Sequence, residues 1–318
     1  QRSTGEGLLT LRLAYRPPFD AHTLLGYLEH RALPGVEDVR GGVYRRTIRL
    51  PHSRGVIELE PLAGAHAVAL RMRLDSLRDL APLVAHCRAL FDLDAAPAAI
   101  GDVLANDRLL GPLVAARPGL RVPGAVDGFE LAVRAILGQQ VSVAGARTMA
   151  GRLVAAAGEP LGRPESALSH FFPTPQALAT ASMDGLGLTQ GRINALRGLA
   201  RAVADDGLNL SRGADWTETV RDLLRIPGIG PWTASYIAMR ALGDPDAFPA
   251  ADLALRHAFE RHGLPGDPHT VERHAQAWRP WRAYAAHHLW AGLPSSPQAQ
   301  PTHQRERAPG AAIVTLSK

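Results

Sequence analysis

The spacing of apolar residues changes near residue 95, and this change constrains the fold of the 318-residue chain more than any other feature. Before it, alternation or β-branched enrichment indicates strands at 8–15, 41–50, 55–61 and 66–74. Helical spacing occupies 21–32 and 76–93, which gives the order β-α-β-β-β-α. We therefore predict that residues 1–95 form an α+β domain, a small antiparallel sheet backed by two helices.

After residue 95 apolar residues recur three and four apart, and no part of 96–293 is convincing as a strand. Short stops that contain Gly, Pro or Asp separate helical segments at 100–116, 128–140, 143–158, 174–181, 189–206, 216–225, 232–242, 253–263 and 284–293. An all-α domain is thus predicted for 96–293. Residues 294–318, rich in Pro, Ser, Gln and Arg, are expected to form a disordered tail.

Composition excludes several classes of protein and site. No apolar run approaches the roughly 20 residues that cross a bilayer, and no signal-like segment opens the chain, so a cytoplasmic protein is expected. Cys87 is the single cysteine, which excludes intrachain disulfides and a four-cysteine iron–sulfur cluster. Of 35 basic residues only Lys318 is lysine, so no ordered lysine can serve as a nucleophile. The net charge of +5 fits nucleic acid, acidic lipid or no particular partner.

A Gly- and Pro-rich turn, IPGIGPW at 226–232, joins two of the predicted helices. Pro231 suits the first position of the second helix, and Gly228 and Gly230 are expected to adopt positive φ and to leave backbone amides uncovered. Amides at a helix N-terminus can bind phosphate. A plain corner between helices would use the same residues. The apolar residues Leu224, Ile226 and Ile229 are spaced to pack beneath the turn, which favours the phosphate-binding interpretation.

Residues 223–259, LLRIPGIGPWTASYIAMRALGDPDAFPAADLALRHAF, resemble the helix-hairpin-helix, loop and aspartate of DNA glycosylases that excise damaged bases. Similarity to the bacterial 3-methyladenine DNA glycosylase II type extends to 128–146, 171–179, 278–290 and 15–32. The resemblance implies that the first domain is similar to one repeat of the TATA-binding protein. It also implies base excision from duplex DNA that carries a damaged base. We expect a monomer that works at the bacterial nucleoid and binds no membrane.

Asp252 directly precedes a helical run in FPAADLALR, which is the pattern of an N-cap residue. The resemblance implies that the same side chain is the catalytic carboxylate, oriented by helix amides that stabilise its charge. Cleavage of a base–sugar bond builds positive charge on the deoxyribose, which a carboxylate beside C1′ stabilises. At about 4 Å and an effective dielectric of about 20 this attraction is roughly 4 kcal/mol. Orientation or deprotonation of the attacking water is an alternative role for the same residue.

Trp232 stands where, by the resemblance, relatives that also nick the strand carry a lysine. Tryptophan forms no imine, so we expect a monofunctional enzyme that uses water and leaves an intact abasic site. Trp232 and Tyr236, one helical turn apart, are expected to hold the cationic ring of an alkylated purine, 3-methyladenine or 7-methylguanine. The resemblance adds Tyr27 and Trp290 to this base pocket, and core packing is the alternative for both.

Other positions have roles that the resemblance implies. Gln140, in GQQVS, stands where relatives carry a leucine wedge that fills the gap left by the flipped base, and a solvated loop residue is the alternative. Leu253 and Ala291 stand where some relatives carry tyrosine, which implies a more open pocket. The residues expected to contact the DNA backbone are Ile226, Gly228, Ile229, Gly230 and Thr233.

No cofactor is expected apart from one ion. The resemblance implies a structural Na⁺ or K⁺ bound by the carbonyls of Ile226 and Ile229. No acidic or His/Cys cluster indicates a catalytic or divalent metal, and His287 and His288 are expected to point one inward and one outward from a helix.

Two other classes of function stay open. Helix-hairpin-helix elements also serve as DNA-binding modules without catalysis, although such a module has no use for Asp252 near phosphates. The chain also starts at Gln1, so it is alternatively the C-terminal half of a fused protein that combines alkylation-response regulation with repair.

Overall fold

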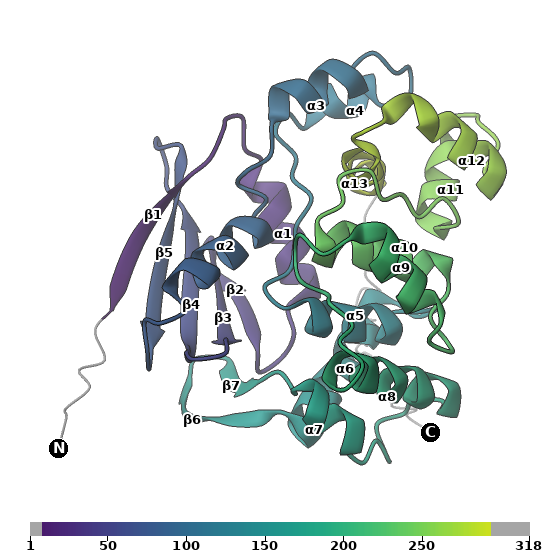
Figure 1. Cartoon of the computed structure of the whole chain (residues 1–318). Coiled ribbons are helices and arrows are strands. Elements are labelled where there is room, and N and C mark those ends of the chain that lie inside the picture. The colour runs from purple at the N-terminus through teal and green to yellow at the C-terminus, as the bar shows by residue number, and fades with distance from the viewer. Residues whose placement is uncertain (1–7, 294–318) are drawn as a thin grey trace, which may run out of the picture.

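The alternating segments before residue 95 form one antiparallel sheet. The computed structural model describes residues 8–293 (Figure 1). The four predicted strands are β1 (Leu9–Ala14), β3 (Val43–Arg49), β4 (Arg54–Pro61) and β5 (Ala67–Leu74). A fifth strand, β2 (Glu37–Arg40), was not predicted, because its four residues are mostly polar. The sheet order is β1-β5-β4-β3-β2.

Two helices cover one face of this sheet, as predicted. They are α1 (Ala21–Arg31) and α2 (Leu80–Leu90). Alternate residues of β5, namely Val68, Leu70 and Met72, share one apolar core with side chains from both helices. Because alternate strand residues share a face, the period-2 pattern was sufficient to predict this layer.

Helices account for most of the chain after residue 95. They are α3 (Pro97–Leu104), α4 (Gly111–Ala116), α5 (Gly128–Leu137), α6 (Val143–Ala157), α7 (Pro175–Thr180), α8 (Gln190–Ala204), α9 (Trp216–Leu224), α10 (Pro231–Ile237), α11 (Leu253–Arg261), α12 (Pro268–Ala275) and α13 (Arg282–Gly292). A π-helical turn, η1 (Ala238–Leu242), continues α10, and a 3₁₀ turn, η2 (Gln276–Trp278), follows α12. The predicted order, a sheet domain followed by a helical domain, is confirmed.

Two helix predictions need correction. The segment 100–116 contains two helices, because the Asp107 carboxylate accepts the amides of Leu109 and Leu110 and so interrupts the first helix. Helix α12 was not predicted, since only Val271 and Ala275 of its eight residues are buried and the apolar period is therefore weak.

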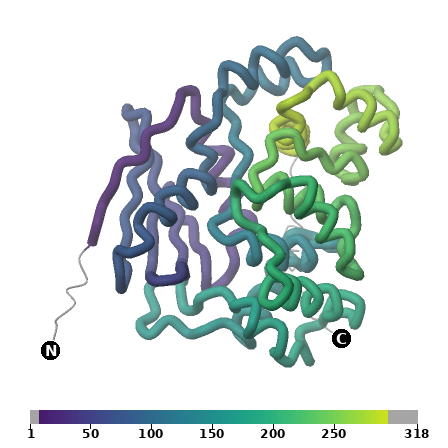
Figure 2. Tube along the Cα trace, viewed as in Figure 1, coloured from purple at the N-terminus to yellow at the C-terminus, as the bar shows by residue number. Residues whose placement is uncertain are grey.

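The prediction that 96–293 contains no strand is wrong at one place. Strands β6 (Glu159–Glu165) and β7 (Leu168–Phe171) form a hairpin that reaches back to the sheet domain, in teal in Figure 2. Most of β6 is exposed and contains two prolines, so its residues carry no alternating apolar signal. Thr47 Oγ1 of β3 donates to the carbonyl of His170 at 2.9 Å, which fixes the hairpin to the sheet.

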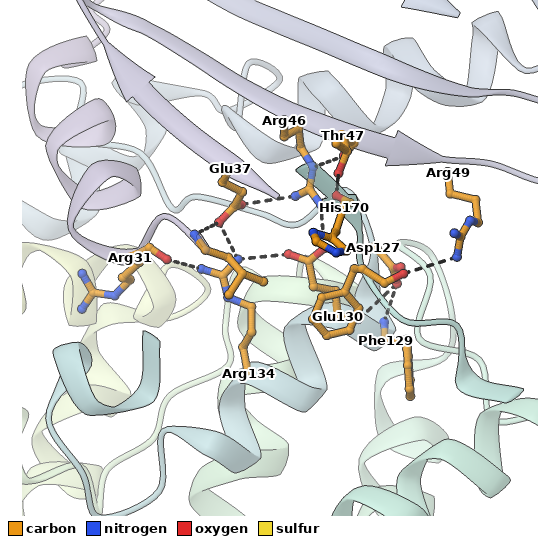
Figure 3. Close-up of polar contacts among 12 residues, drawn as sticks. Arg31, Glu37, Arg46, Thr47, Arg49, Asp127, Phe129, Glu130, Arg134 and His170 are labelled. Carbon is orange, nitrogen blue, oxygen red and sulfur yellow. Dashed lines mark hydrogen bonds and ion pairs between the residues drawn. The ribbon is translucent and has the colours of Figure 1, made fainter. Parts of the chain in front are cut away.

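A buried network of charged side chains also joins the sheet to the helices (Figure 3). Arg46 of β3 contacts Glu37 of β2 at 3.3 Å and Glu130 of α5 at 2.6 Å. Arg134 of α5 contacts the same two carboxylates at 2.8 and 3.0 Å. Burial opposes ionisation of Glu37, but Arg134 and Arg46 outweigh it and lower the pKa of Glu37 to about 2. Two acids and two bases therefore form a neutral cluster between the domains.

Two predictions concern the membrane and the tail. Within the described range, 8–293, no helix has the length and apolar character that crossing a bilayer requires. The predicted disordered tail, 294–318, lies outside the described residues.

Candidate active site

The Gly- and Pro-rich turn connects α9 to α10, as predicted, but its two glycines differ. Gly228 has φ of +92°, and a side chain there would meet Ala195, whose Cβ lies 2.8 Å from the ideal Cβ position. Gly230 is the N-cap of α10 with φ of −95°, so the prediction of positive φ is wrong for this residue. Ile226 and Ile229 are buried in the helical core beneath the turn, as their spacing indicated. The same prediction is wrong for Leu224, which is 44% exposed at the end of α9.

Gln139, for which no role was predicted, holds this turn. Its Nε2 donates to the Gly228 carbonyl and to Thr233 Oγ1, both at 2.9 Å. Arg192 in turn donates to the Gln139 carbonyl at 2.5 Å. Thr233 is only 2% exposed, and its hydroxyl accepts the Gln139 amide, so its side chain serves the turn from inside the protein.

Asp252 caps α11, as its sequence position predicted. Its Oδ1 accepts the amide of Leu255 at 3.0 Å and the indole N–H of Trp290 at 2.9 Å. Its Oδ2 accepts the indole N–H of Trp232 at 2.9 Å. Three donors from three helices therefore fix the carboxylate, and Oδ2, with a single donor, keeps a lone pair available.

The four aromatic residues predicted for the base pocket lie together around Asp252. Trp232 stacks on Tyr236 with ring centroids 5.5 Å apart and planes 10° from parallel. The Tyr236 and Trp290 rings are 6.5 Å apart, and the Tyr27 and Tyr236 hydroxyls are 3.0 Å apart. All five side chains line a cavity of about 380 Å³, large enough for a purine base. The four-residue spacing of Trp232 and Tyr236 on α10, together with the family resemblance, predicted that these side chains lie in one pocket.

Arg240 also lines the cavity, and it was not predicted as a site residue. It lies one turn after Tyr236, within the π-helical turn, and is 5% exposed. Its NH1 donates to the hydroxyls of Tyr236, at 2.7 Å, and Tyr27, while its Nε and NH2 donate to the carbonyls of Pro123 and Gly124. The spacing 232, 236, 240 was a signal that could have found it.

Arg240 alters the two phenols unequally. Burial raises the pKa of Tyr236 above its usual value. Burial acts in the same direction on Tyr27, but the guanidinium groups of Arg240 and Arg31 outweigh it and lower the pKa of Tyr27. The Arg31 guanidinium carbon lies 3.9 Å from the Tyr27 ring centroid, on the face of the ring. Tyr27 is therefore the more acidic hydroxyl of the pair.

His287 is a further neighbour of the site. Its ring centroid is 4.9 Å from that of Trp290 and 5.6 Å from that of Tyr27. Burial, with Arg240 nearby, lowers the pKa of His287 well below its usual value, so the ring is neutral. The prediction that only one of the two adjacent histidines points inward is wrong, because His287 and His288 are 5% and 4% exposed.

The predicted wedge and the two tyrosine replacements lie outside the aromatic group. Gln140 is exposed at the turn between α5 and α6, with φ of +55°. Leu253 is 59% exposed, and neither Leu253 nor Ala291 lines the cavity. Within residues 8–293, no group of three or more His, Cys, Asp or Glu side chains could hold a metal.

Comparisons with known proteins agree with this geometry. The chain matches the AlkA N-terminal domain over residues 10–127 and the HhH-GPD superfamily base excision DNA repair protein over residues 133–283. It is 38% identical to DNA-3-methyladenine glycosylase 2 of Escherichia coli, with 87% of this chain and 95% of that protein covered.

A second relative is longer. The chain is 47% identical to the "Probable bifunctional transcriptional activator/DNA repair enzyme AlkA" of Mycobacterium tuberculosis over 90% of its own length, but it spans only 58% of that protein. The fold is similar to that of a 3-methyladenine DNA-glycosylase from Archaeoglobus fulgidus, with a TM-score of 0.76, 22% identity and coverage of 88% and 97% of the two chains. The chain therefore belongs to the AlkA family of DNA-3-methyladenine glycosylases, within the HhH-GPD superfamily of base excision DNA repair proteins.

Proposed function

We propose that the chain is a monofunctional DNA glycosylase that hydrolytically releases alkylated purines of the 3-methyladenine and 7-methylguanine type from duplex DNA. The observation that carries the proposal is the Asp252 carboxylate, which the indole N–H groups of Trp232 and Trp290 hold at 2.9 Å on the wall of a purine-sized cavity. The name of the Escherichia coli relative supports the substrate class.

The proposed chemistry follows from this arrangement. As the base leaves, positive charge develops on the sugar, and Asp252 stabilises it without reorganising, because its donors are already in position. The tryptophan and tyrosine rings bind the cationic base by cation–π attraction. Water is the nucleophile, since Lys318 is the only lysine of the chain and Trp232 occupies the position after the hairpin. The product is an intact abasic site.

The hairpin would bind the DNA backbone through the amides of Gly228, Gly230 and Thr233. The amides of Ile226 and Ile229 already donate to the carbonyls of Leu223 and Ile226, so these two residues would shape the turn. The Ile226 carbonyl already accepts the Ile229 amide at 3.0 Å, but a carbonyl has two lone pairs, so a structural Na⁺ or K⁺ also fits there. Gln140, exposed at a turn with positive φ, is the proposed wedge for the gap left by the flipped base. The proposed active form is a monomer in the bacterial cytoplasm.

Replacement of Asp252 with Asn tests this function. Single-turnover release of 7-methylguanine should fall at least about a hundredfold, because stabilisation of the transition-state charge is lost. Binding to duplex DNA with an abasic site should stay nearly unchanged. Asp267→Asn is the matched control, since Asp267 caps α12 in the same way, accepting the Thr270 amide at 2.9 Å, but lies outside the cavity lining.

The same reactions test the monofunctional step. Before alkali or heat is applied, the wild-type protein should leave the DNA strand uncut, and borohydride should trap no covalent complex. Equal losses of base release and of abasic-site binding in the Asp252 variant would contradict the assignment. Strand cleavage without alkali would contradict the use of water as nucleophile.

The name of the Mycobacterium tuberculosis relative favours a second proposal. Domains like these would then act within a longer protein that also activates transcription. The mass of the natural protein, measured on an immunoblot of its source cells, distinguishes the two arrangements.

A further inference from the structure

One side chain joins the turn between α5 and α6, which carries Gln140, to the hairpin. Gln139 directly precedes Gln140, and its Nε2 donates to the Gly228 carbonyl and to Thr233 Oγ1, both at 2.9 Å. A side-chain amide has two N–H groups, so Gln139 uses both of them on the hairpin and on the start of α10. The turn and the hairpin, 89 residues apart in sequence, are therefore held directly against each other.

This contact also fixes the direction of the hairpin amides. The Gly228 carbonyl accepts from Gln139, and the N–H of the same peptide unit, that of Ile229, donates to the Ile226 carbonyl at 3.0 Å. The peptide unit is thus held at both of its polar groups. The amides of Gly228 and Gly230, which we propose bind phosphate, lie on either side of it. Their direction toward a DNA backbone depends on Gln139.

The main chain of the turn is anchored on both sides of its tip. Arg192 of α8 donates to the Gln139 carbonyl at 2.5 Å. On the other side Ser142 caps α6, where its Oγ accepts a backbone amide at 3.1 Å. Only Gln140 and Val141 lie between these two anchored residues, and both are exposed.

The backbone of Gln140 needs this support. Its φ is +55°, in a region that residues with a side chain rarely adopt. A residue keeps such a conformation only where the surrounding structure holds it. Because Gln139 and Ser142 are fixed, Gln140 projects in one direction before DNA is bound. A side chain that is already in its bound arrangement loses less entropy when it is inserted.

We propose that Gln139 is a positioning residue that couples the phosphate-binding hairpin to the wedge, so that the two engage DNA as one rigid unit. This inference rests on the proposed glycosylase function, with Gln140 as the wedge. When the hairpin amides bind the backbone, the link through Gly228 sets how far Gln140 enters the gap left by the flipped base. Base extrusion then depends on Gln139, although this residue does not line the base cavity.

A double-mutant cycle tests the coupling. Single-turnover release of 7-methylguanine from duplex DNA, at saturating protein, is measured for the wild type, Gln139→Glu, Gln140→Ala and the double variant. Glutamate keeps the shape of the side chain but turns an oxygen toward the Gly228 carbonyl. Each single change should slow release at least about tenfold, because the extruded state is no longer filled. The double variant should be within about twofold of Gln140→Ala, since no wedge is left to position.

Two further variants complete the experiment. Gln139→Met has a similar length, no charge and no donor, so it should show the same non-additivity with Gln140→Ala. Gln190→Glu is the matched control for charge, because Gln190 opens α8 beside the hairpin but contacts Asn194 through its Nε2. It should keep the wild-type rate. Saturating protein removes the effect of weaker hairpin binding, and urea unfolding shows that each variant is folded.

The outcomes separate the coupling from the glycosylase function. Losses that multiply in the double variant would show that Gln139 acts independently of Gln140 and would overturn the coupling. Release at the wild-type rate by both Gln139 variants, or by Gln140→Ala, would overturn it as well. Each of these results leaves the glycosylase proposal intact, whereas a wild-type protein that releases no base would overturn the glycosylase proposal itself.

Discussion

Two buried arginines, Arg46 and Arg240, line the same cavity but have different partners. Arg46 is neutralised by Glu37 and Glu130, with Arg134 as a second base. Arg240 contacts only carbonyls and phenols among the described residues.

The difference shows how partners decide what a buried charge does. The neutral cluster around Arg46 connects β3 to α5 and leaves little net field, so we assign it to fixing the sheet domain against the helices. The charge of Arg240 is not neutralised, and its field therefore acts on the phenols and on whatever occupies the cavity. Arg46 and Arg240 are the same residue type and are both buried, so only their partners distinguish their roles.

Arg46→Met should give the largest effect on stability. Glu37 and Glu130 would stay buried with one base between them, and loss of one member of such a cluster costs about 3–5 kcal/mol in unfolding free energy. Urea unfolding of the wild type and the variant measures this. Arg45→Met is the matched control on the same strand, since Arg45 pairs with Glu58 at a partly exposed site. Such pairs contribute about 1 kcal/mol or less. Equal losses would show that the buried cluster has no special role.

Asp92→Asn tests a buried acidic side chain, as a comparison with the buried basic side chain of Arg240. Asp92 is 5% exposed and accepts the Tyr284 hydroxyl at 2.8 Å, and burial raises the pKa of Asp92 from 3.8 to about 6. Its contribution to stability is full below pH 3.8 and is lost as pH rises through about 6. The Asn variant does not titrate, so relative to the wild type it should gain up to about 3 kcal/mol between pH 4 and pH 7.

Unfolding free energies at several pH values measure this gain. Asp94→Asn, an exposed aspartate in the same loop, is the matched control. A constant difference between wild type and Asp92→Asn across this pH range would show that Asp92 stays ionised in the folded protein, and the contrast with Arg240 would then disappear.

The smallest expected effect comes from the two hairpin glycines. Gly228 has no room for a side chain, whereas Gly230 has open space around it. Gly228→Ala forces a side chain to φ of +92° and against Ala195, which should cost about 1–2 kcal/mol and weaken binding to abasic-site DNA. Gly230→Ala should change stability by less than about 0.5 kcal/mol, because its φ is −95° and no atom lies within 4 Å of the added carbon. Thermal unfolding and a binding titration measure both. Similar losses from both changes would contradict the difference in confinement.

Local pattern predicted the parts of the site that lie close in sequence. Asp252 precedes a helical run and is an N-cap, and Trp232 and Tyr236 share a helix face because they are four residues apart. Strand β2 was not predicted, because Glu37 is buried through ion pairs with Arg46 of β3 and Arg134 of α5. The four residues of β2 by themselves do not indicate these partners. Hairpin β6–β7 escaped because its exposed first strand has no apolar alternation.

The sequence alone determined which reactive groups the chain contains. These groups are a carboxylate at a helix start, two aromatic rings one helical turn apart, and a single lysine. They are properties of residue type and short spacing, and folding does not change them. The tertiary structure decided which groups meet. Trp290, 38 residues from Asp252, donates to its carboxylate, and Tyr27 reaches Tyr236 across the domain boundary. Such contacts depend on how separate elements pack, and no local sequence pattern encodes them. For the same reason, the sequence could not show that Arg240 is buried without a carboxylate partner among the described residues.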